Sequence, residues 1–553
     1  MARWIAFAGN DRRRRAGRVR LFSFAQAGLT LPSVMLVALC CALPLAWLVW
    51  TVLVNPEAHT TAGLSWFSLS LLGRTLLYNF AVAILATLVG LPAALVLGRG
   101  SMLCRRLLWV VLPMGLMMPS LAYAYGWSQF VRLCRPAFDV MGVTFEPASW
   151  PDVARCIWTL AAWLWPIPAV VIGLALRRMD VAVQQQAVLD GVLWRITLRQ
   201  LLSPIIVSVA AVTLLATQEF AVYEPTGISV VATEVRMVFE TGAFSGPAQS
   251  TNAAAVRPFP TQATRAASAA STALPLLAVT ILLAGIACAG STRADCADDV
   301  ATGSWPRVLR APAWAGIAAV LLAMVTLGVP VGSLIMAMRI PLSASHIWTE
   351  FGPELTGALL IAAVTVALCF LLSLVAVAVW VRGSLLLAGL SFLIGGELLA
   401  IAMIRIWSRS EFTWIYDAWP LPVMAYLGRF AWLSLAMARG SWTSRWDELR
   451  AMAALDGAGC VRTAVWVLWP LTWPSLLAAA LLAGALSMTE VAATVLLHPQ
   501  NPQVLTPMLM SWVHMARYDP MIEASLLMMG MVFVPTLVAV GLWSLSRHFS
   551  GRL

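Results

Sequence analysis

The sequence is dominated by apolar runs that are long enough to cross a lipid bilayer as helices. Of its 553 residues, 61% are hydrophobic and only 11% are charged, whereas soluble domains carry roughly 25% charged residues. A membrane-spanning helix needs about 20 consecutive apolar residues. Twelve such runs lie near 29–54, 75–98, 107–127, 157–176, 204–223, 272–290, 312–337, 355–381, 384–404, 420–438, 474–497 and 521–545. The sequence therefore predicts an all-α integral membrane protein with about twelve spans.

The basic side chains narrow the chemistry, because all 36 of them are arginine and the sequence contains no lysine. A phosphate-binding P-loop requires a lysine, and catalysis through a Schiff base requires a lysine amine. We therefore expect a chain that is not an enzyme and has no cofactor of its own, so that any ATP is bound by partner subunits. The net charge is +11, but the arginines lie mainly at the ends of apolar runs, which favours a lipid bilayer over nucleic acid as the partner.

Arginines concentrate in the connections that an even number of spans would place in the cytoplasm, as the positive-inside rule requires. External connections hold fewer arginines and mix them with acids, as in Arg405, Arg409, Glu411 and Asp417. We therefore expect a multi-pass protein of the cell inner membrane with both termini in the cytoplasm. The connections predicted to be cytoplasmic contain Arg99, Arg105, Arg106, Arg177, Arg178, Arg195, Arg199, Arg293, Arg307, Arg310, Arg439, Arg445, Arg450 and Arg462.

The predicted spans fall into two groups of six. The expected organisation is a cytoplasmic Arg-rich tail at 1–28, a six-span repeat at 29–290, a cytoplasmic linker at 291–311, a second six-span repeat at 312–545 and a cytoplasmic C-terminus at 546–553. Within the first repeat, residues 243–271 are rich in Ala, Ser, Thr and Pro. This composition predicts a flexible external loop.

A repeated pentapeptide gives the strongest sign of an internal repeat. Ala-x-Leu-Asp-Gly occurs at Ala187–Gly191 and again at Ala453–Gly457, 266 residues later. In each copy a proline, Pro204 or Pro470, follows the glycine by 13 residues. Both copies follow the fourth predicted span of their half. Because each half has six spans, the two halves are predicted to be parallel repeats with the same orientation.

Each copy of the pentapeptide ends a stretch that can form a short helix, at 181–189 or at 447–455. The glycine permits the left-handed turn that ends a helix and lets a second helix begin. One interpretation is a rigid cytoplasmic knob that inserts into a groove of a soluble partner. The alternative is an ordinary amphipathic loop that lies at the lipid interface.

At these residues the chain resembles the membrane subunits of binding-protein-dependent ABC importers, whose cytoplasmic coupling loop carries EAA-x-x-x-G, nine further residues and I-x-L-P. Both copies lack the family's glutamate, which puts in doubt any ion pair that this glutamate makes with the ATPase. Asp190, Asp456 and Glu448 are further candidate coupling residues of the two loops. The motif positions are taken by Gln185, Gln186, Ala187, Gly191, Leu201, Ser203 and Pro204 in the first copy, and by Ala451, Met452, Ala453, Gly457, Val467, Trp469 and Pro470 in the second.

Two such loops in one chain resemble the fused, double-length permeases of the iron(III) importer type, a group that includes importers of thiamine and of aminoethylphosphonate. The resemblance implies a type I ABC importer permease fold, two copies of a separate ABC ATPase and an external periplasmic solute-binding protein. The resemblance also implies that the chain transports a solute, and iron(III) is the solute that we expect before the other two. An ion-coupled secondary transporter with two six-span halves fits the span count equally well.

Three acids near the fifth spans, two in the first half and one in the second, are candidates for a translocation pathway. A carboxylate near a span is costly unless it has a function. Glu490 lies 20 residues after Pro470, whereas Glu219 lies 15 and Glu224 lies 20 residues after Pro204. The spacing does not decide which of the two matches Glu490. The alternative to a cation pathway is hydrogen bonding to a neighbouring helix or exposure at the external end of the span.

Overall fold

Helices make up every regular element in the described part of the chain. The computed structural model describes residues 24–54, 66–142, 145, 149–241, 262–294, 309–339, 343–442, 444–499, 501–515 and 517–550. Within these ranges there is no β-strand. Most of the predicted tail, most of the linker and residues 242–261 of the predicted loop lie outside them.

Nine helices in the described ranges are long and apolar enough to cross a membrane, and up to twelve if each of three bent helix pairs counts as one span. This agrees with the predicted all-α, multi-pass membrane protein. The nine comprise α2–η1–α3 (Phe24–Val37, Ala38–Ala42, Leu43–Val54), α5 (Trp66–Arg99), α12 (Leu193–Thr217), α14 (Gln262–Ala294), α15–η5–α16 (Ala313–Ala323, Met324–Gly328, Val329–Ala337), α17 (Ala344–Ala378), α21 (Pro420–Gly440), α23–η7–α24 (Cys460–Thr463, Ala464–Leu468, Trp469–Thr489) and α27 (Tyr518–Ser550).

The three bent pairs break at proline or glycine. The pairs are α6–α7 (Met102–Leu116, Ser120–Leu133), bent by 94°, α9–α10 (Trp150–Leu164, Pro166–Arg177), bent by 43°, and α18–α19 (Ser384–Leu393, Gly396–Trp407), bent by 105°. Pro119 precedes α7 and Pro166 opens α10, while Gly395 precedes α19 with φ +85°. Proline removes a helical hydrogen bond and glycine tolerates positive φ, so both break an apolar run without making it polar.

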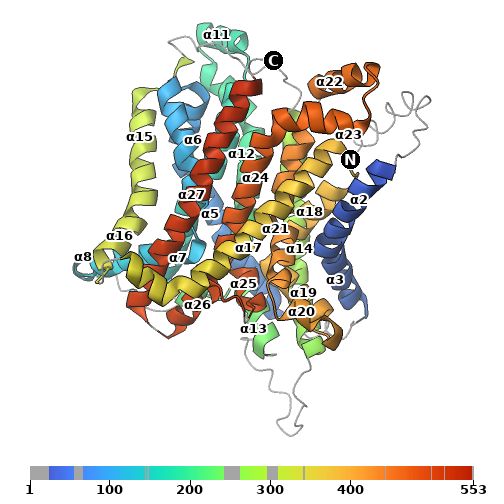
Figure 1. Cartoon of the computed structure of the whole chain (residues 1–553). Helices are drawn as coiled ribbons and strands as arrows, with labels where there is room; N and C mark the ends of the chain where they lie inside the picture. The colour runs from blue at the N-terminus through green and yellow to red at the C-terminus, as the bar shows by residue number, and fades with distance from the viewer. Residues whose placement is uncertain are drawn as a thin grey trace.

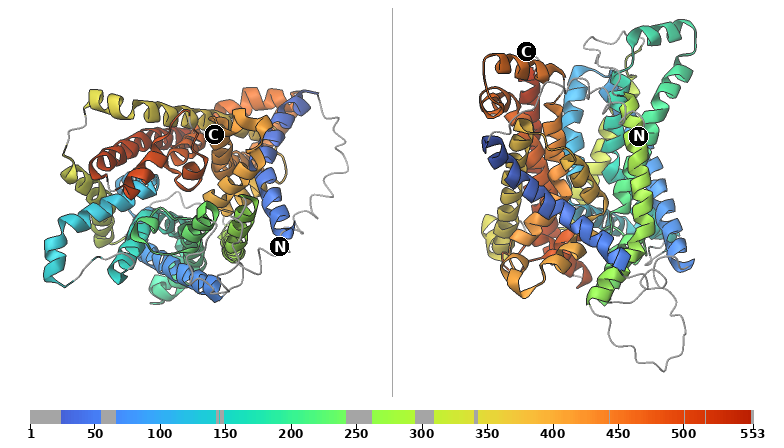
Figure 2. Two further views of the ribbon diagram at one scale, coloured as in Figure 1. Left: turned by 90° about the horizontal axis from the view of Figure 1, so that it is seen from below. Right: turned by 90° about the vertical axis from the view of Figure 1, so that its right-hand side faces the viewer.

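The first long helix of each half packs against the other half. Helices α15 and α16 lie against α5 and α7, whereas α2, η1 and α3 lie against α17, α18, α19 and α21. Figure 2 shows the blue α2 and α3 beside orange helices of the second half. No local sequence pattern predicted that these helices would pack against the other half.

Both exchanged helices contain a π turn followed by a proline, at Pro44 and at Pro330. Because proline cannot bond the carbonyl four residues before it, these carbonyls are free for other contacts. The freed Thr326 carbonyl accepts a 2.7 Å hydrogen bond from the hydroxyl of Tyr123. The freed Cys40 carbonyl lies against Gly428, where a Cβ would approach it to 2.6 Å. One freed carbonyl is thus hydrogen-bonded to the opposite half, and the other is packed closely against it.

The remaining long helices pack in two series with the same order along the chain. Helix α5 contacts α10 and α12, α10 contacts α12, and α12 contacts α14. In the second half α17 contacts α21 and α24, α21 contacts α24, and α24 contacts α27. The buried side chains of these contacts form large apolar clusters. Helices α11 (Val181–Leu189) and α22 (Ser444–Leu455) project from one face of this bundle, the face at which α27 ends (Figure 1).

Two expectations are corrected by these helices. The predicted fifth span at 204–223 is α12, which begins at Leu193, contains Pro204 inside it and ends at Thr217. Residues 262–271, predicted to be part of a flexible loop, form the start of α14, because alanine is the best helix former and four of these alanines are buried. The predicted span at 420–438 is α21, and Arg429 is the tenth of its 21 residues.

Candidate functional site

The short helix α11 has local signals at both of its ends. Asp180 caps its first turn, accepting a 2.8 Å hydrogen bond from the amide of Ala182. At the other end the amide of Val192 bonds the carbonyl of Ala187 at 2.9 Å, and the amide of Gly191 bonds that of Val188 at 3.1 Å. With Gly191 at φ +67°, these two bonds are those of a Schellman motif. The predicted helix at 181–189 is confirmed with the same bounds.

The second helix, α22, ends in the same way. The amide of Ala458 bonds the carbonyl of Ala453 at 2.9 Å, and the amide of Gly457 bonds that of Ala454 at 3.1 Å. Gly457 has φ +77°, as the pentapeptide predicts. The Ala-x-Leu-Asp-Gly pentapeptide is thus one motif of helix termination, and Ala187 and Ala453 occupy the same place in it.

Different contacts hold the two helices to the bundle. In α11 the side chain of Gln184 is fully buried. Its Oε1 accepts hydrogen bonds of 3.0 Å from Arg99 and from Thr197, and its Nε2 donates to Gln200 at 2.9 Å. Because the side chain of Gln184 is buried and forms these hydrogen bonds within the protein, it is not available to bind a partner.

In α22 the side chain of Arg450 provides the anchor. Its guanidinium donates to the carbonyl of Ser441 at 2.7 Å and to that of Val377 at 3.4 Å. It also stacks 3.9 Å above the ring of Trp442, while the exposed Asp447 lies 3.5 Å away. Arg450 is therefore turned toward the bundle and not toward solvent.

The side chains that remain on the surface are similar at the tips of the two helices. Leu189 is 80% exposed and Leu455 is 88% exposed, and each is followed by an exposed aspartate and glycine. Among the other candidate coupling residues, Ala187 is buried and Ala453 and Pro204 are half-buried. The exposed ones are Gln185, Gln186, Asp190, Gly191, Glu448, Ala451, Asp456, Gly457 and Pro470. Two apolar tips flanked by acids thus lie on one face of the molecule.

A second candidate site is a buried polar cluster around Arg429, which is 6% exposed. Its guanidinium donates to Gln218 Oε1 at 2.8 Å and to the Phe392 carbonyl at 2.9 Å, and it lies 3.5 Å from Glu490 Oε2. Gln218, Phe392 and Glu490 follow or form the C-terminal ends of α12, α18 and α24. Because helix C-termini carry partial negative charge, a buried arginine is well placed where three of them meet.

Among the predicted pathway acids, Glu219 and Glu490 belong to this cluster. Both follow the end of a fifth-span helix, and neither lies within it. Glu219 is near enough to Glu490, Arg429 and Ser120 to interact with them electrostatically. Of the two acids that the spacing left as alternatives, Glu219 therefore lies beside Glu490.

Glu224 lies elsewhere, in the short 3-10 helix η3 (Glu224–Thr226). It is paired with Arg236 at 2.8 Å and lies 3.5 Å from His514. Burial raises the pKa of Glu224, and the neighbouring Arg236 and His514 partly offset this rise. Arg236 belongs to α13 (Val231–Thr241) and also bonds Glu240 at 2.8 Å.

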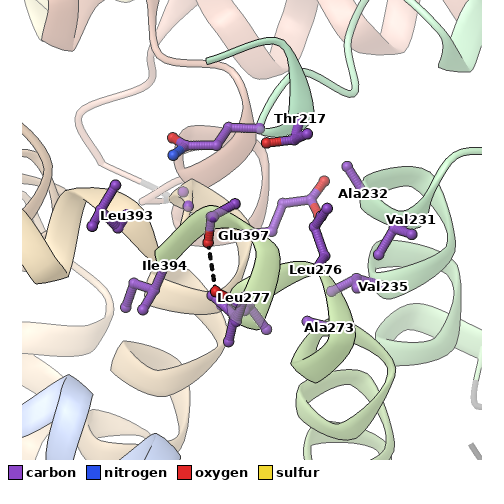
Figure 3. A pocket seen from close by; sticks show the side chains of 15 residues that line it. Thr217, Val231, Ala232, Val235, Ala273, Leu276, Leu277, Leu393, Ile394 and Glu397 are labelled. Atoms are coloured by element: carbon purple, nitrogen blue, oxygen red, sulfur yellow. Dashed lines mark hydrogen bonds between the residues drawn. The ribbon is translucent and has the colours of Figure 1, made fainter. Parts of the chain in front are cut away.

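Sequence reasoning missed Glu397, the second residue of α19. It is 6% exposed and lines a cavity of about 40 Å³ between α12, α13 and α14 on one side and the α18–α19 break on the other (Figure 3). The Gly395-Gly396 pair immediately before it could have signalled a break in the apolar run. Within the described residues no group of three or more His, Cys, Asp or Glu side chains is arranged to hold a metal ion.

Comparison with known proteins finds no matching family model, no similar curated protein and no similar solved structure. The fold therefore carries the functional argument by itself. Its many apolar helices fit a membrane transporter in general.

Proposed function

We propose that this chain is the fused transmembrane permease of an ABC importer, built from two parallel six-span repeats. In this account α11 and α22 are the coupling helices, and each docks into one copy of a separate ATPase. An external solute-binding protein delivers the solute, with iron(III) the first candidate and thiamine or aminoethylphosphonate the others. The chain lies in the inner membrane with both termini in the cytoplasm.

The observation that carries this proposal is the pair of matching Schellman turns on one face of the bundle. Each presents an exposed leucine, Leu189 or Leu455, followed by aspartate and glycine. Because the two tips are similar, two copies of one soluble protein are favoured over two different proteins. Because these helices end in fixed turns and are bonded to the bundle through Gln184 and Arg450, movement of a docked partner would be transmitted to the spans.

The packing of the long helices supports two repeats. The α5, α10, α12 and α14 contacts recur in the same order as α17, α21, α24 and α27. The absence of lysine leaves the chain without a P-loop, which agrees with ATP binding on partner subunits. Glu219 and Glu490, from equivalent helix ends, are proposed to line the translocation pathway where the halves meet.

The test is retention of the ATPase when both turns are broken. A valine at a left-handed position is strained, so Gly191→Val with Gly457→Val should abolish co-purification of the ATPase from native membranes. The matched control is Gly383→Val, at φ +88° between α17 and α18 and likewise without a close neighbour. We expect the ATPase to be lost from the double variant and retained by the Gly383→Val control. Retention in the double variant would remove the coupling role of α11 and α22.

The buried Arg429–Glu490 pair favours a second candidate, an ion-coupled secondary transporter. Ionisable groups within spans often mark ion pathways, and here Arg429 lies half-way along α21 while Glu490 follows the end of α24. This candidate requires no ATPase. It would be supported if uptake of the solute into liposomes by the purified chain needed an ion gradient and no ATP.

A further inference from the structure

The carboxyl group of Glu397 lies at the seam between the two halves. Helix α19 contacts α13 and α14 of the first half, and the cavity beside Glu397 is lined from both sides. Its apolar lining includes Val231, Val235, Leu276, Leu277 and Leu398, and its polar lining includes Thr217, Gln218 and Thr280. Figure 3 shows Glu397 among these side chains. A cavity of about 40 Å³ has room for a few water molecules at most.

Within the described part of the chain, no basic side chain forms an ion pair with Glu397. Among the described residues its Oε1 has no hydrogen-bond partner. The charged groups that act on it are Arg236 and Glu240 from α13, Glu224 from η3, and Glu490 from the end of α24. Arg236 is already bonded to both Glu224 and Glu240, at 2.8 Å each. Glu490 is already paired with Arg429. The surroundings of Glu397 therefore carry more negative than positive charge.

A buried carboxylate without a paired cation, one of whose oxygens has no hydrogen-bond donor, is costly in a protein interior. We infer that Glu397 is a proton-binding site, occupied in this arrangement of the helices. The proton comes from a hydronium ion in water that enters the cavity: one O–H bond of the hydronium breaks as an O–H bond forms on the carboxylate, and a neutral water molecule remains. The neutral acid can then remain in an apolar seam.

A proton fits this cavity better than a metal ion does. A bare cation needs several oxygen ligands, whereas most of the lining side chains are apolar. The hydroxyls of Thr217 and Thr280 already donate to the carbonyls of Leu214 and Leu277, and Gln218 Oε1 accepts from Arg429. Besides the Glu397 carboxylate, the side chains of the lining therefore offer a cation only the hydroxyl oxygens of Thr217 and Thr280, which keep their lone pairs, and these are fewer ligands than a dehydrated ion requires.

The position of the site links proton binding to movement. The wall of the cavity formed by α13 and α14 belongs to the first half, and the wall formed by α18 and α19 belongs to the second. Separation of these walls admits water, which solvates the carboxylate and releases the proton. Closure of the seam therefore takes up one proton. This inference does not rest on ATPase docking, because protonation and ATPase retention are measured separately.

Infrared difference spectroscopy of the full-length chain in lipid nanodiscs at neutral pH tests the inference. We expect a carboxylic-acid C=O band in the wild type that is lost in Glu397→Gln and is shifted but retained in Glu397→Asp. Glutamine has the shape of the neutral acid, so folding should be preserved. If Glu397→Gln removes only a carboxylate band, the inference is wrong.

Glu490→Gln is the matched control, because Glu490 is an equally buried glutamate that is paired with Arg429. It should remove a carboxylate band and leave the acid band of Glu397 present, shifted at most by the loss of a neighbouring negative charge. A second arm compares spectra in sodium and in N-methylglucamine. Equal acid bands in the two media are expected. An acid band that arises only when sodium is withdrawn would identify sodium as the occupant and overturn the assignment to a proton.

Discussion

Gln184 and Arg450 occupy equivalent positions, each three residues before the alanine of the Ala-x-Leu-Asp-Gly pentapeptide, and each binds its short helix to the bundle. Gln184 is held by the side chains of Arg99, Thr197 and Gln200, whereas Arg450 holds main-chain carbonyls. The two projecting helices thus share a position and a turn, but each has its own anchor.

Arg450→Ala should loosen α22 without affecting α11. Hydrogen bonds from a charged donor contribute about 1.5–3 kcal/mol when they are shielded from water, and stacking on Trp442 adds to this. We expect local opening of α22 to become easier by an amount of this order, measured as faster amide hydrogen exchange of residues 444–455. Arg450→Lys keeps the charge but loses the planar stacking, so its exchange rate should lie between those of the wild type and Arg450→Ala. Equal exchange in all three proteins would contradict the anchoring role.

The two projecting helices should contribute unequally to ATPase binding. Glu448 is an exposed acid on α22, whereas the exposed side chains of α11 include the uncharged Gln185. Glu448→Ala should weaken ATPase association more than Gln185→Ala, by less than about 1 kcal/mol or about fivefold. The difference should shrink as salt screens the charge. Titration of the ATPase at two ionic strengths provides the measurement. Equal, salt-independent losses would indicate docking by shape and apolar contact alone.

Arg429 should stabilise the protein mainly by neutralising the buried Glu490. Arg429→Met leaves Glu490 buried and unpaired, which costs about 3–5 kcal/mol. Adding Glu490→Gln removes that uncompensated charge, so the double variant should be more stable than Arg429→Met. Thermal unfolding in detergent of the wild type, both single variants and the double variant completes the cycle. A double variant less stable than both single variants would show that the pair is not coupled in this way.

The face that carries α11 and α22 should be cytoplasmic. In a background without native cysteines, Leu189→Cys and Leu455→Cys should resist a membrane-impermeant thiol reagent added to intact cells. Trp348→Cys, at the exposed start of α17, should react. The arginine distribution is the physical reason for this orientation. The reverse labelling pattern would invert the proposed topology.

Local features of the structure follow from local sequence. The helix at 181–189 could be predicted because its N-cap aspartate and C-terminal glycine are adjacent to it in the chain. Hydrophobicity located the spans but did not reveal the bends, since α18 and α19 read as one apolar run although they meet at 105°. An apolar run indicates that a segment is buried in lipid or protein, but it does not indicate the direction in which the helix axis runs.

The polar interior was harder to predict because its partners are remote in sequence. Arg429 bonds Gln218, which is 211 residues away, so the sequence showed only a charge within a predicted span. Glu397 lies next to a glycine pair, yet one wall of its cavity is formed by helices of the other half. The exchange of α2–α3 and α15–α16 between the halves likewise depends on packing of the whole bundle.

The mass of the intact complex purified through this chain from its native membrane tests the central proposal most directly. Two equivalent projecting turns predict one copy of this chain with two copies of a single ATP-binding polypeptide. The double variant Gly191→Val, Gly457→Val should give the mass of the chain without them. A wild-type complex that contains no ATP-binding subunit, in a preparation that still transports its solute, would contradict the proposal.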